Sequence, residues 1–187
     1  MNLPNKLTLA RLVLTGIFFV FIASKDVVLQ NVSLLLFIVA ALTDLADGYV
    51  ARKYGMVTDF GRVADPFADK ILVCGALIFL LAKNQGTDDS RVRAWMVVLI
   101  LAREFLVSGI RSIAESRNIP FGANYWGKLK TLSQNFAVGF SILYVANSSF
   151  RWIWPVVDGV LYLSVSMTLI SGLVYVIRAK RILRIDA

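Results

Sequence analysis

The chain has 187 residues, of which 58% are hydrophobic, and this apolar excess over ordinary soluble domains predicts lipid-facing surface within one domain, residues 1–187. Its formal charge of +8 does not point to a nucleic-acid partner, because basic residues of membrane proteins collect at the cytoplasmic face. The absence of histidine and the presence of one cysteine, Cys74, exclude histidine catalysis, histidine-ligated zinc and an intramolecular disulfide.

Six apolar stretches follow one another, each near the roughly 20 residues that a helix needs to cross a bilayer. They cover residues 10–24, 31–51, 65–83, 94–116, 127–147 and 153–178. A short amphipathic piece, Leu3 to Arg11, precedes the first stretch, and we expect it to lie along the membrane interface. The sequence therefore predicts an all-α integral membrane protein with six transmembrane helices and a short N-terminal interfacial helix.

The basic residues predict the orientation of these spans. Fifteen of the 20 Lys and Arg residues fall on the side that holds both termini and the loops at 52–64 and 117–127. This asymmetry predicts that both termini and these loops face the cytoplasm, with the protein in the cell membrane. An even number of spans also puts both termini on one side, so the two arguments agree.

Four aspartates lie where the second span ends and the third begins: Asp44, Asp47, Asp65 and Asp69. Their i,i+3 and i,i+4 spacing puts each pair on one helix face, and the short loop makes the two helices antiparallel neighbours. Carboxylates inside a membrane are costly and usually mark function. Oxygen-only ligands suit Mg²⁺, Mn²⁺ or Ca²⁺, so the pattern predicts two divalent ions that clamp a phosphoryl group. The alternatives are a structural polar cluster or a cation pathway through a small transporter.

Small residues and one arginine accompany the aspartates. Gly48 follows the first pair directly, and Gly61 lies one turn before Asp65 on the same face. Their missing side chains allow a bulky ligand to approach the backbone closely. Arg52 lies on the stripe of Asp44 and Gly48, where a guanidinium can meet a phosphate.

The whole motif reads Asp44-x-x-Asp47-Gly48-x-x-Ala51-Arg52, eight residues, then Gly61-x-x-x-Asp65-x-x-x-Asp69. It resembles the complete signature of the CDP-alcohol phosphotransferase family, and no position departs from it. The resemblance implies that an alcohol hydroxyl attacks the β-phosphoryl group of a CDP-linked donor and that CMP leaves. It implies that the four aspartates bind two Mg²⁺ or Mn²⁺ ions and that Asp69 is the general base. It also implies CDP contacts from Gly48, Ala51, Arg52 and Gly61.

Basic residues of the fourth and fifth spans bear on the acceptor. Arg103 and Arg111 are eight residues apart and share a helix face. Arg103 lies inside an apolar run and needs an anionic partner, although the adjacent Glu104 is expected to face elsewhere. Lys128 and Lys130 open the fifth span from the same side. Such a pocket suits an acceptor that carries a phosphate, while the alternative is that these cations reach lipid headgroups as anchors.

Three segments resemble family members whose acceptor is sn-glycerol 3-phosphate. They are the N-terminal stretch with Pro4-Asn5, Arg103-Glu104-Phe105, and Gly127-Lys128-x-Lys130-Thr131-x-x-Gln134. The resemblance implies CDP-diacylglycerol as donor, Asn5 over the nucleotide and a homodimer in the lipid membrane; helix capping is the alternative for Asn5. Inositol phosphate suits a similar pocket and is the competing acceptor.

Overall fold

The computed structural model describes residues 3–54, 59–84, 90–117, 119 and 125–183, with side chains outside 3–8, 44–54, 59–66, 69, 148 and 181–183. The described residues form six α-helices and one short 3₁₀ helix, η1, without a strand. The elements are α1 (Leu3–Ala23), α2 (Val27–Tyr54), α3 (Asp59–Lys83), α4 (Ala94–Ser116), α5 (Tyr125–Ala146), η1 (Ser148–Ile153) and α6 (Trp154–Leu183).

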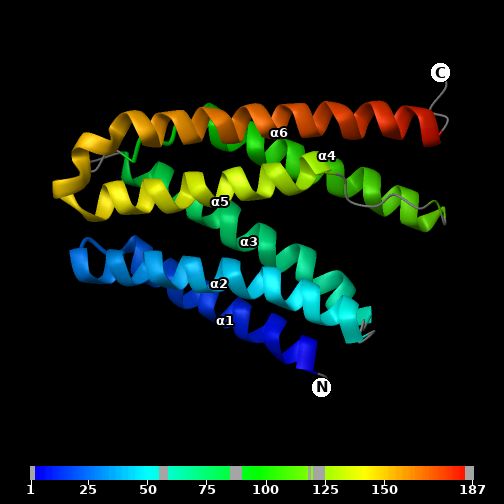
Figure 1. The fold of residues 1–187 in the computed structure, drawn as a ribbon, viewed down its shortest axis with the longest axis horizontal. Helices are drawn as coiled ribbons and strands as arrows, with labels where there is room; N and C mark the ends of the chain where they lie inside the picture. Colours follow the sequence, from blue (N-terminus) through cyan, green and yellow to red (C-terminus); the bar gives the residue numbers. More distant parts are fainter. Residues whose placement is uncertain (1–2, 55–58, 85–89, 118, 120–124, 184–187) are drawn as a thin grey trace.

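The helices run up and down, so that both chain termini lie at one end of the bundle (Figure 1). At this end, called the termini end below, α2 and α4 finish and α3 and α5 begin. The pairs α1–α2 and α5–α6 pack together, α5 also packs against α2, and α3 packs against α1 and α4. The fold therefore gathers the aspartate-bearing segments and the basic segments at the termini end.

Polar side chains fix the opposite end of the bundle. Asp26 Oδ1 accepts hydrogen bonds from the backbone N–H groups of Val28 at 2.7 Å and Leu29 at 3.2 Å, which caps the start of α2. Asn147 Nδ2 donates to Asn31 Oδ1 at 2.8 Å, and Asn31 Nδ2 donates back to Asn147 Oδ1 at 3.4 Å. This mutual amide pair holds the start of α2 against the end of α5.

Apolar side chains fill the bundle and also cover much of its outside. The buried core includes Phe18, Phe37, Leu77, Leu80 and Ile142. Many large apolar side chains point outward instead, among them Val20, Leu35, Val98, Leu163 and Leu173. Apolar surface of this extent is typical of proteins that meet a membrane or a partner. By length and apolar composition, one helical stretch of the described chain, residues 149–180, can cross a membrane.

The all-helical expectation is confirmed for the described residues, and α4 has the predicted bounds of 94–116. The separate interfacial helix expected at Leu3 to Arg11 is wrong, because α1 runs without a break from Leu3 to Ala23. Pro4 lies in the first helical turn, where a missing N–H group is tolerated, and no second proline follows it in α1. The amphipathic piece is therefore the first part of α1.

A close approach of α1 and α3 yields a prediction. A Cβ added to Gly75 would overlap Cζ of Phe19, whose ring stacks on Phe79 with centroids 5.2 Å apart. Gly75→Leu should therefore lower the free energy of unfolding in detergent by about 1–3 kcal/mol through overpacking. Gly16→Leu is the matched control, since its added Cβ meets nothing within 4 Å. Equal destabilisation by the two changes would contradict the close approach.

Candidate functional site

The four aspartates occupy helical positions at the termini end. Asp44 and Asp47 lie in the last turns of α2, and Asp65 and Asp69 lie in the first half of α3. The end of α2 and the start of α3 meet at this end of the bundle (Figure 1). The side chains of all four fall outside the described part, as do those predicted to contact CDP: Asn5, Gly48, Ala51, Arg52 and Gly61. Their metal and nucleotide contacts stay predictions.

A buried acid joins two cations nearby. Glu104 Oε1 accepts a hydrogen bond from Lys130 Nζ at 2.5 Å and another from Arg103 Nη1 at 3.1 Å. The three side chains are only 7–10% exposed. Ions in such surroundings are stable only when paired and hydrogen-bonded. The cluster therefore ties α4, which carries Arg103 and Glu104, to α5, which carries Lys130.

The expectation that Arg103 needs an anionic partner is confirmed, but the expectation that Glu104 faces elsewhere is wrong. The Cα–Cβ directions of adjacent helical residues do diverge. The long arginine side chain nevertheless curls back, because Lys130 already holds the carboxylate in the apolar interior where Arg103 also lies. Sharing one acid leaves neither cation unpaired.

Helix α6 completes the surroundings of the two arginines. Arg103 Nη2 donates to Ser171 Oγ at 2.5 Å, and its Cζ lies 5.4 Å from the centroid of the Tyr175 ring. Arg111 Nη2 donates to the hydroxyl of Tyr175 at 3.4 Å. Both arginines therefore reach the same tyrosine, which confirms that they share one face of α4. Gly172 leaves room for the Arg103 side chain, because a Cβ added at Gly172 would lie 3.1 Å from Arg103 Cγ.

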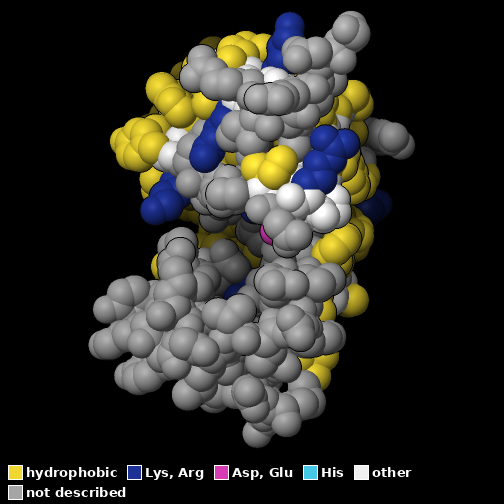
Figure 2. Space-filling view, turned by 90° about the vertical axis from the view of Figure 1, so that its right-hand side faces the viewer, with side chains coloured by type: hydrophobic (Ala, Val, Ile, Leu, Met, Phe, Trp, Pro, Cys, Tyr) yellow, Lys and Arg dark blue, Asp and Glu magenta, His cyan; other side chains and the backbone are white. Residues whose placement is uncertain are grey.

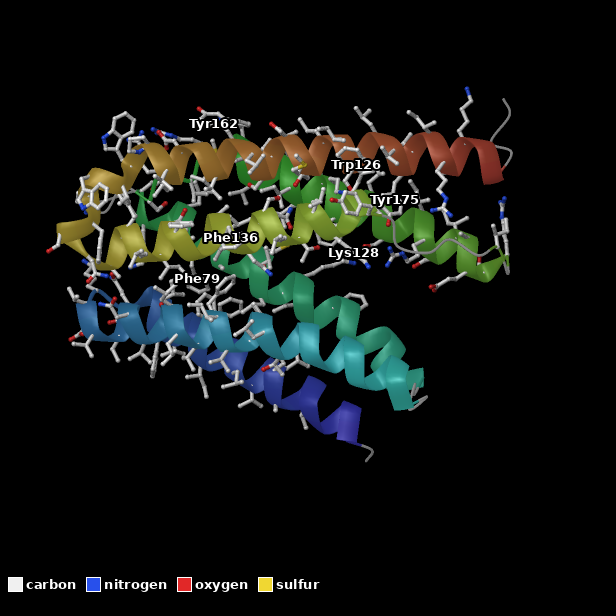
Figure 3. All side chains as sticks on the ribbon, viewed as in Figure 1. Phe79, Trp126, Lys128, Phe136, Tyr162 and Tyr175 are labelled. Carbon is white, nitrogen blue, oxygen red and sulfur yellow. The ribbon has the colours of Figure 1, made fainter. Side chains whose placement is uncertain are left out.

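Two donors of this cluster have no acceptor within the described part of the chain. The Nε atoms of Arg103 and Arg111 are buried and make no hydrogen bond to any described residue. Buried N–H groups are normally satisfied, so such donors are available to a ligand or water. Lys128 is exposed and lies outside the Glu104 network. Figure 3 shows Tyr175 and Lys128 toward the termini end.

One contact links this cluster to α3. Lys70, the residue after Asp69, donates from Nζ to Ser108 Oγ. Ser108 lies one turn beyond Glu104 and donates to its backbone carbonyl at 2.7 Å. The α3 backbone beside Asp69 therefore lies near the face of α4 that carries the basic cluster. Figure 2 looks onto the termini end and shows Lys and Arg side chains at several places on this face.

Sequence reasoning missed three members of the cluster: the acid Glu104 and the α6 residues Ser171 and Tyr175. Glu104 could have been found, because it and Lys130 are opposite charges in two apolar runs and each needs a partner. Ser171 and Tyr175 lie in a long apolar helix, and no spacing distinguishes them from neighbouring residues. Their role depends on how α6 packs against α4.

Comparison with known proteins gives consistent matches along the chain. The family model for CDP-alcohol phosphatidyltransferase matches residues 1–174. A CDP-diacylglycerol–glycerol-3-phosphate 3-phosphatidyltransferase of Bacillus subtilis is 38% identical over 187 residues, covering 93% of each chain. The enzyme of the same name from Rickettsia typhi is 37% identical over 174 residues, covering 93% of this chain and 94% of its own. A probable phosphatidylglycerophosphate synthase of Mycobacterium tuberculosis is 37% identical over 183 residues, covering 96% and 82%.

The Glu104 cluster yields a stability prediction. Glu104→Gln leaves two buried cations without their shared anion, which should lower the free energy of unfolding by about 3–5 kcal/mol. Asp158→Asn is the matched control, because it removes the acid of the Arg91–Asp158 pair, whose side chains are 24% and 26% exposed. Its effect should be smaller, about 1–2 kcal/mol, because this pair is more exposed and the amide oxygen of asparagine can still accept from Arg91. Unfolding followed in detergent measures both, and a Glu104→Gln variant as stable as the control would contradict the buried cluster.

Proposed function

The chain belongs to the CDP-alcohol phosphatidyltransferase family, and from this premise we propose that it transfers the phosphatidyl group of CDP-diacylglycerol to sn-glycerol 3-phosphate. CMP is the second product. The names of the Bacillus and Rickettsia relatives support this donor and acceptor, at 37–38% identity over 93% of this chain. The observation that carries the acceptor assignment is the pair of buried Nε atoms of Arg103 and Arg111, which have no hydrogen-bond partner among the described residues.

The acceptor phosphate would bind in the basic cluster. Arg103 and Arg111 offer donors around Tyr175, and guanidinium groups suit the oxygen geometry of phosphate. Lys130 contributes positive charge while its bond to Glu104 holds it in place. Lys128 is exposed and would contact the phosphate from the entrance. The Lys70–Ser108 contact brings this cluster near the segment of α3 that carries Asp69.

The donor would bind to the other half of the bundle, at the ends of α2 and α3. The four aspartates of these helix ends offer oxygen ligands of the kind that hard divalent cations prefer, and we propose that two Mg²⁺ or Mn²⁺ ions bind there. Such ions stabilise the charge that develops on a transferred phosphoryl group. Asp44, Asp47, Asp65 and Asp69 would hold them.

The remaining motif residues would act on the nucleotide and on the acceptor hydroxyl. Asn5, Gly48, Ala51, Arg52 and Gly61 would contact the CDP moiety. Asp69 would take the proton of the acceptor hydroxyl as that oxygen attacks the β-phosphoryl group of the donor. The bond to CMP breaks as the new ester bond forms, and the product keeps the phosphate of glycerol 3-phosphate.

The membrane arrangement is part of the proposal. All six helices would cross the bilayer as a single domain of residues 1–187, and the chain would assemble as a homodimer. The outward apolar side chains support contact with lipid. The termini end would face the cytoplasm, because fifteen of the 20 Lys and Arg residues belong to that side.

The aspartate site is tested by isosteric substitution. Asp44→Asn, Asp47→Asn, Asp65→Asn and Asp69→Asn should each lower the rate of CMP release by about 100-fold or more, because each removes a ligand or the base. EDTA should abolish activity, and added Mg²⁺ or Mn²⁺ should restore it. Asp26→Asn is the matched control, since an asparagine can still cap α2 at the far end. Near-normal CMP release by Asp65→Asn would refute the two-ion site, and ion flux without CMP release would favour a transporter.

The acceptor pocket is tested by truncating one arginine. Arg111→Ala should raise the KM for glycerol 3-phosphate by about 10- to 150-fold, the range for losing a charge-assisted hydrogen bond. The KM for CDP-diacylglycerol should change little, because the donor binds the α2–α3 ends. The exposed Arg93, just before α4 at the far end, provides the control variant Arg93→Ala. Faster CMP release with inositol phosphate than with glycerol 3-phosphate would reassign the acceptor.

A further inference from the structure

Helix α1 carries a charged side chain inside the bundle, and neither proposed substrate site uses it. Arg11 is only 1% exposed and is among the largest side chains that the bundle buries completely. It continues a buried stripe of α1 with Thr15, Phe18 and Ile22, which are at most 1% exposed. Helix α1 packs against α2 and α3, so this stripe faces these two helices. A guanidinium buried there is stable only when anionic groups pair with it.

An aromatic contact gives the level of Arg11 along α2. The ring centroids of Phe18 and Phe37 lie 5.8 Å apart, and the two helices run in opposite directions (Figure 1). Seven residues from Phe18 toward the termini end is Arg11, and seven residues from Phe37 toward the same end is Asp44. Seven residues are about two helical turns, so both positions stay on the facing sides of their helices. Arg11 and Asp44 therefore lie at one level of the bundle.

Helix α3 runs in the same direction as α1 and gives the same level independently. The ring of Phe19 stacks on Phe79 and occupies the space beside Gly75, so it lies between these two residues of α3. Eight residues back from Phe19 along α1 is Arg11. Eight residues back along α3, from the midpoint of Gly75 and Phe79, is Asp69. Contacts with two different helices thus bring Arg11 to the level of two motif positions.

The four motif aspartates are the acids of α2 and α3 nearest to this level. The acids whose side chains the structure describes lie at the far end of the bundle or on α4: Asp26, Glu104, Glu115 and Asp158. Asp59 begins α3 about 15 Å beyond Asp69, at 1.5 Å per helical residue. A long helical side chain leans toward the N-terminus of its helix, so Arg11 extends from the level of Asp69 toward that of Asp65.

We propose that Arg11 is the resident counter-ion of the aspartate site, where its fixed charge compensates the motif carboxylates before divalent ions bind. The inference rests on the proposed function and adds a residue of α1 to a site drawn from α2 and α3. Carboxylates gathered at one end of a bundle repel one another, and a nearby guanidinium lowers that cost. A carboxylate has two oxygens, so one aspartate can meet Arg11 and an ion together. When two divalent ions balance four carboxylates, Arg11 leaves net positive charge for the anionic donor.

The pairing is tested by thermal unfolding in detergent with EDTA, without a measurement of activity. Arg11→Met removes the charge and should lower the melting temperature by about 6 °C or more, because buried acid loses its compensation. Adding Asp44→Asn or Asp69→Asn should regain at least half of this loss, counted beyond the shift that the same change gives in the unmutated protein. Arg11→Lys keeps the charge and should lose less than Arg11→Met.

The control breaks an ion pair at the far end. Arg91→Met leaves Asp158 without this arginine, and its effect should add to that of each Asp→Asn change without coupling. Coupling of Arg11→Met with any of the four motif aspartates supports the pairing and identifies the partner, whereas additivity at all four overturns it. If Arg11→Met does not fold, the double variants decide: a folded one supports the pairing, and failure of all four overturns it.

Metal binding separates a charge effect from general damage. Without donor, Mn²⁺ should bind Arg11→Met at least as tightly as the unmutated protein, because a like charge has been removed. Electron paramagnetic resonance measures this binding, and a several-fold weaker affinity would mean a merely structural role and overturn the counter-ion. The KM for CDP-diacylglycerol should rise by about 3-fold or more, since positive charge near the donor is lost. Absence of CMP release by the unmutated protein would instead overturn the proposed function, and the unfolding cycle would still decide the pairing.

Discussion

Glu104 Oε1 accepts hydrogen bonds from two cations, Lys130 on α5 and the adjacent Arg103 on α4. In the apolar interior none of these three charges is stable alone, so each fixes the position of the others. The Arg103 side chain also contacts α6, where it donates to Ser171 and lies against the ring of Tyr175. A single acid thus sets the relative positions of three helices at the depth where phosphate is proposed to bind. The same packing positions the guanidinium group of Arg111, which contacts Tyr175 of α6.

The charged groups that are proposed to bind the two substrates are divided between two halves of the bundle. The four motif aspartates belong to the α2 and α3 ends, and Arg103, Arg111 and Lys130 belong to α4 and α5, with the Lys70–Ser108 contact between the halves. A transfer between two substrates benefits from this division, because each half can bind one substrate and the packing between halves sets their separation. Small errors in such separation slow reactions strongly. The packing of α3 on α4 and of α2 on α5 is accordingly part of the proposed chemistry.

The apolar runs of the sequence were sufficient to place all six helices, and they gave α4 its observed ends. They were less informative where a helix continues beyond its apolar part, as α1 does back to Leu3 and α2 does to Tyr54. Spacing in the sequence also predicted that Arg103 and Arg111 share a helix face, because the helical period is a property of one helix alone. The Glu104–Lys130 pairing depends on how two separate helices meet. Spacing along either helix carries no information about this, so the pairing was not predicted.

The mutual amide pair of Asn31 and Asn147 holds α2 to α5 at the end of the bundle away from the aspartate segments. Amide groups do not titrate, so this contact is independent of pH. The Glu104 cluster is made of charged groups and depends on the ionised form of its acid. Loss of that charge would therefore loosen the bundle at the termini end, while the far end would keep α2 and α5 together.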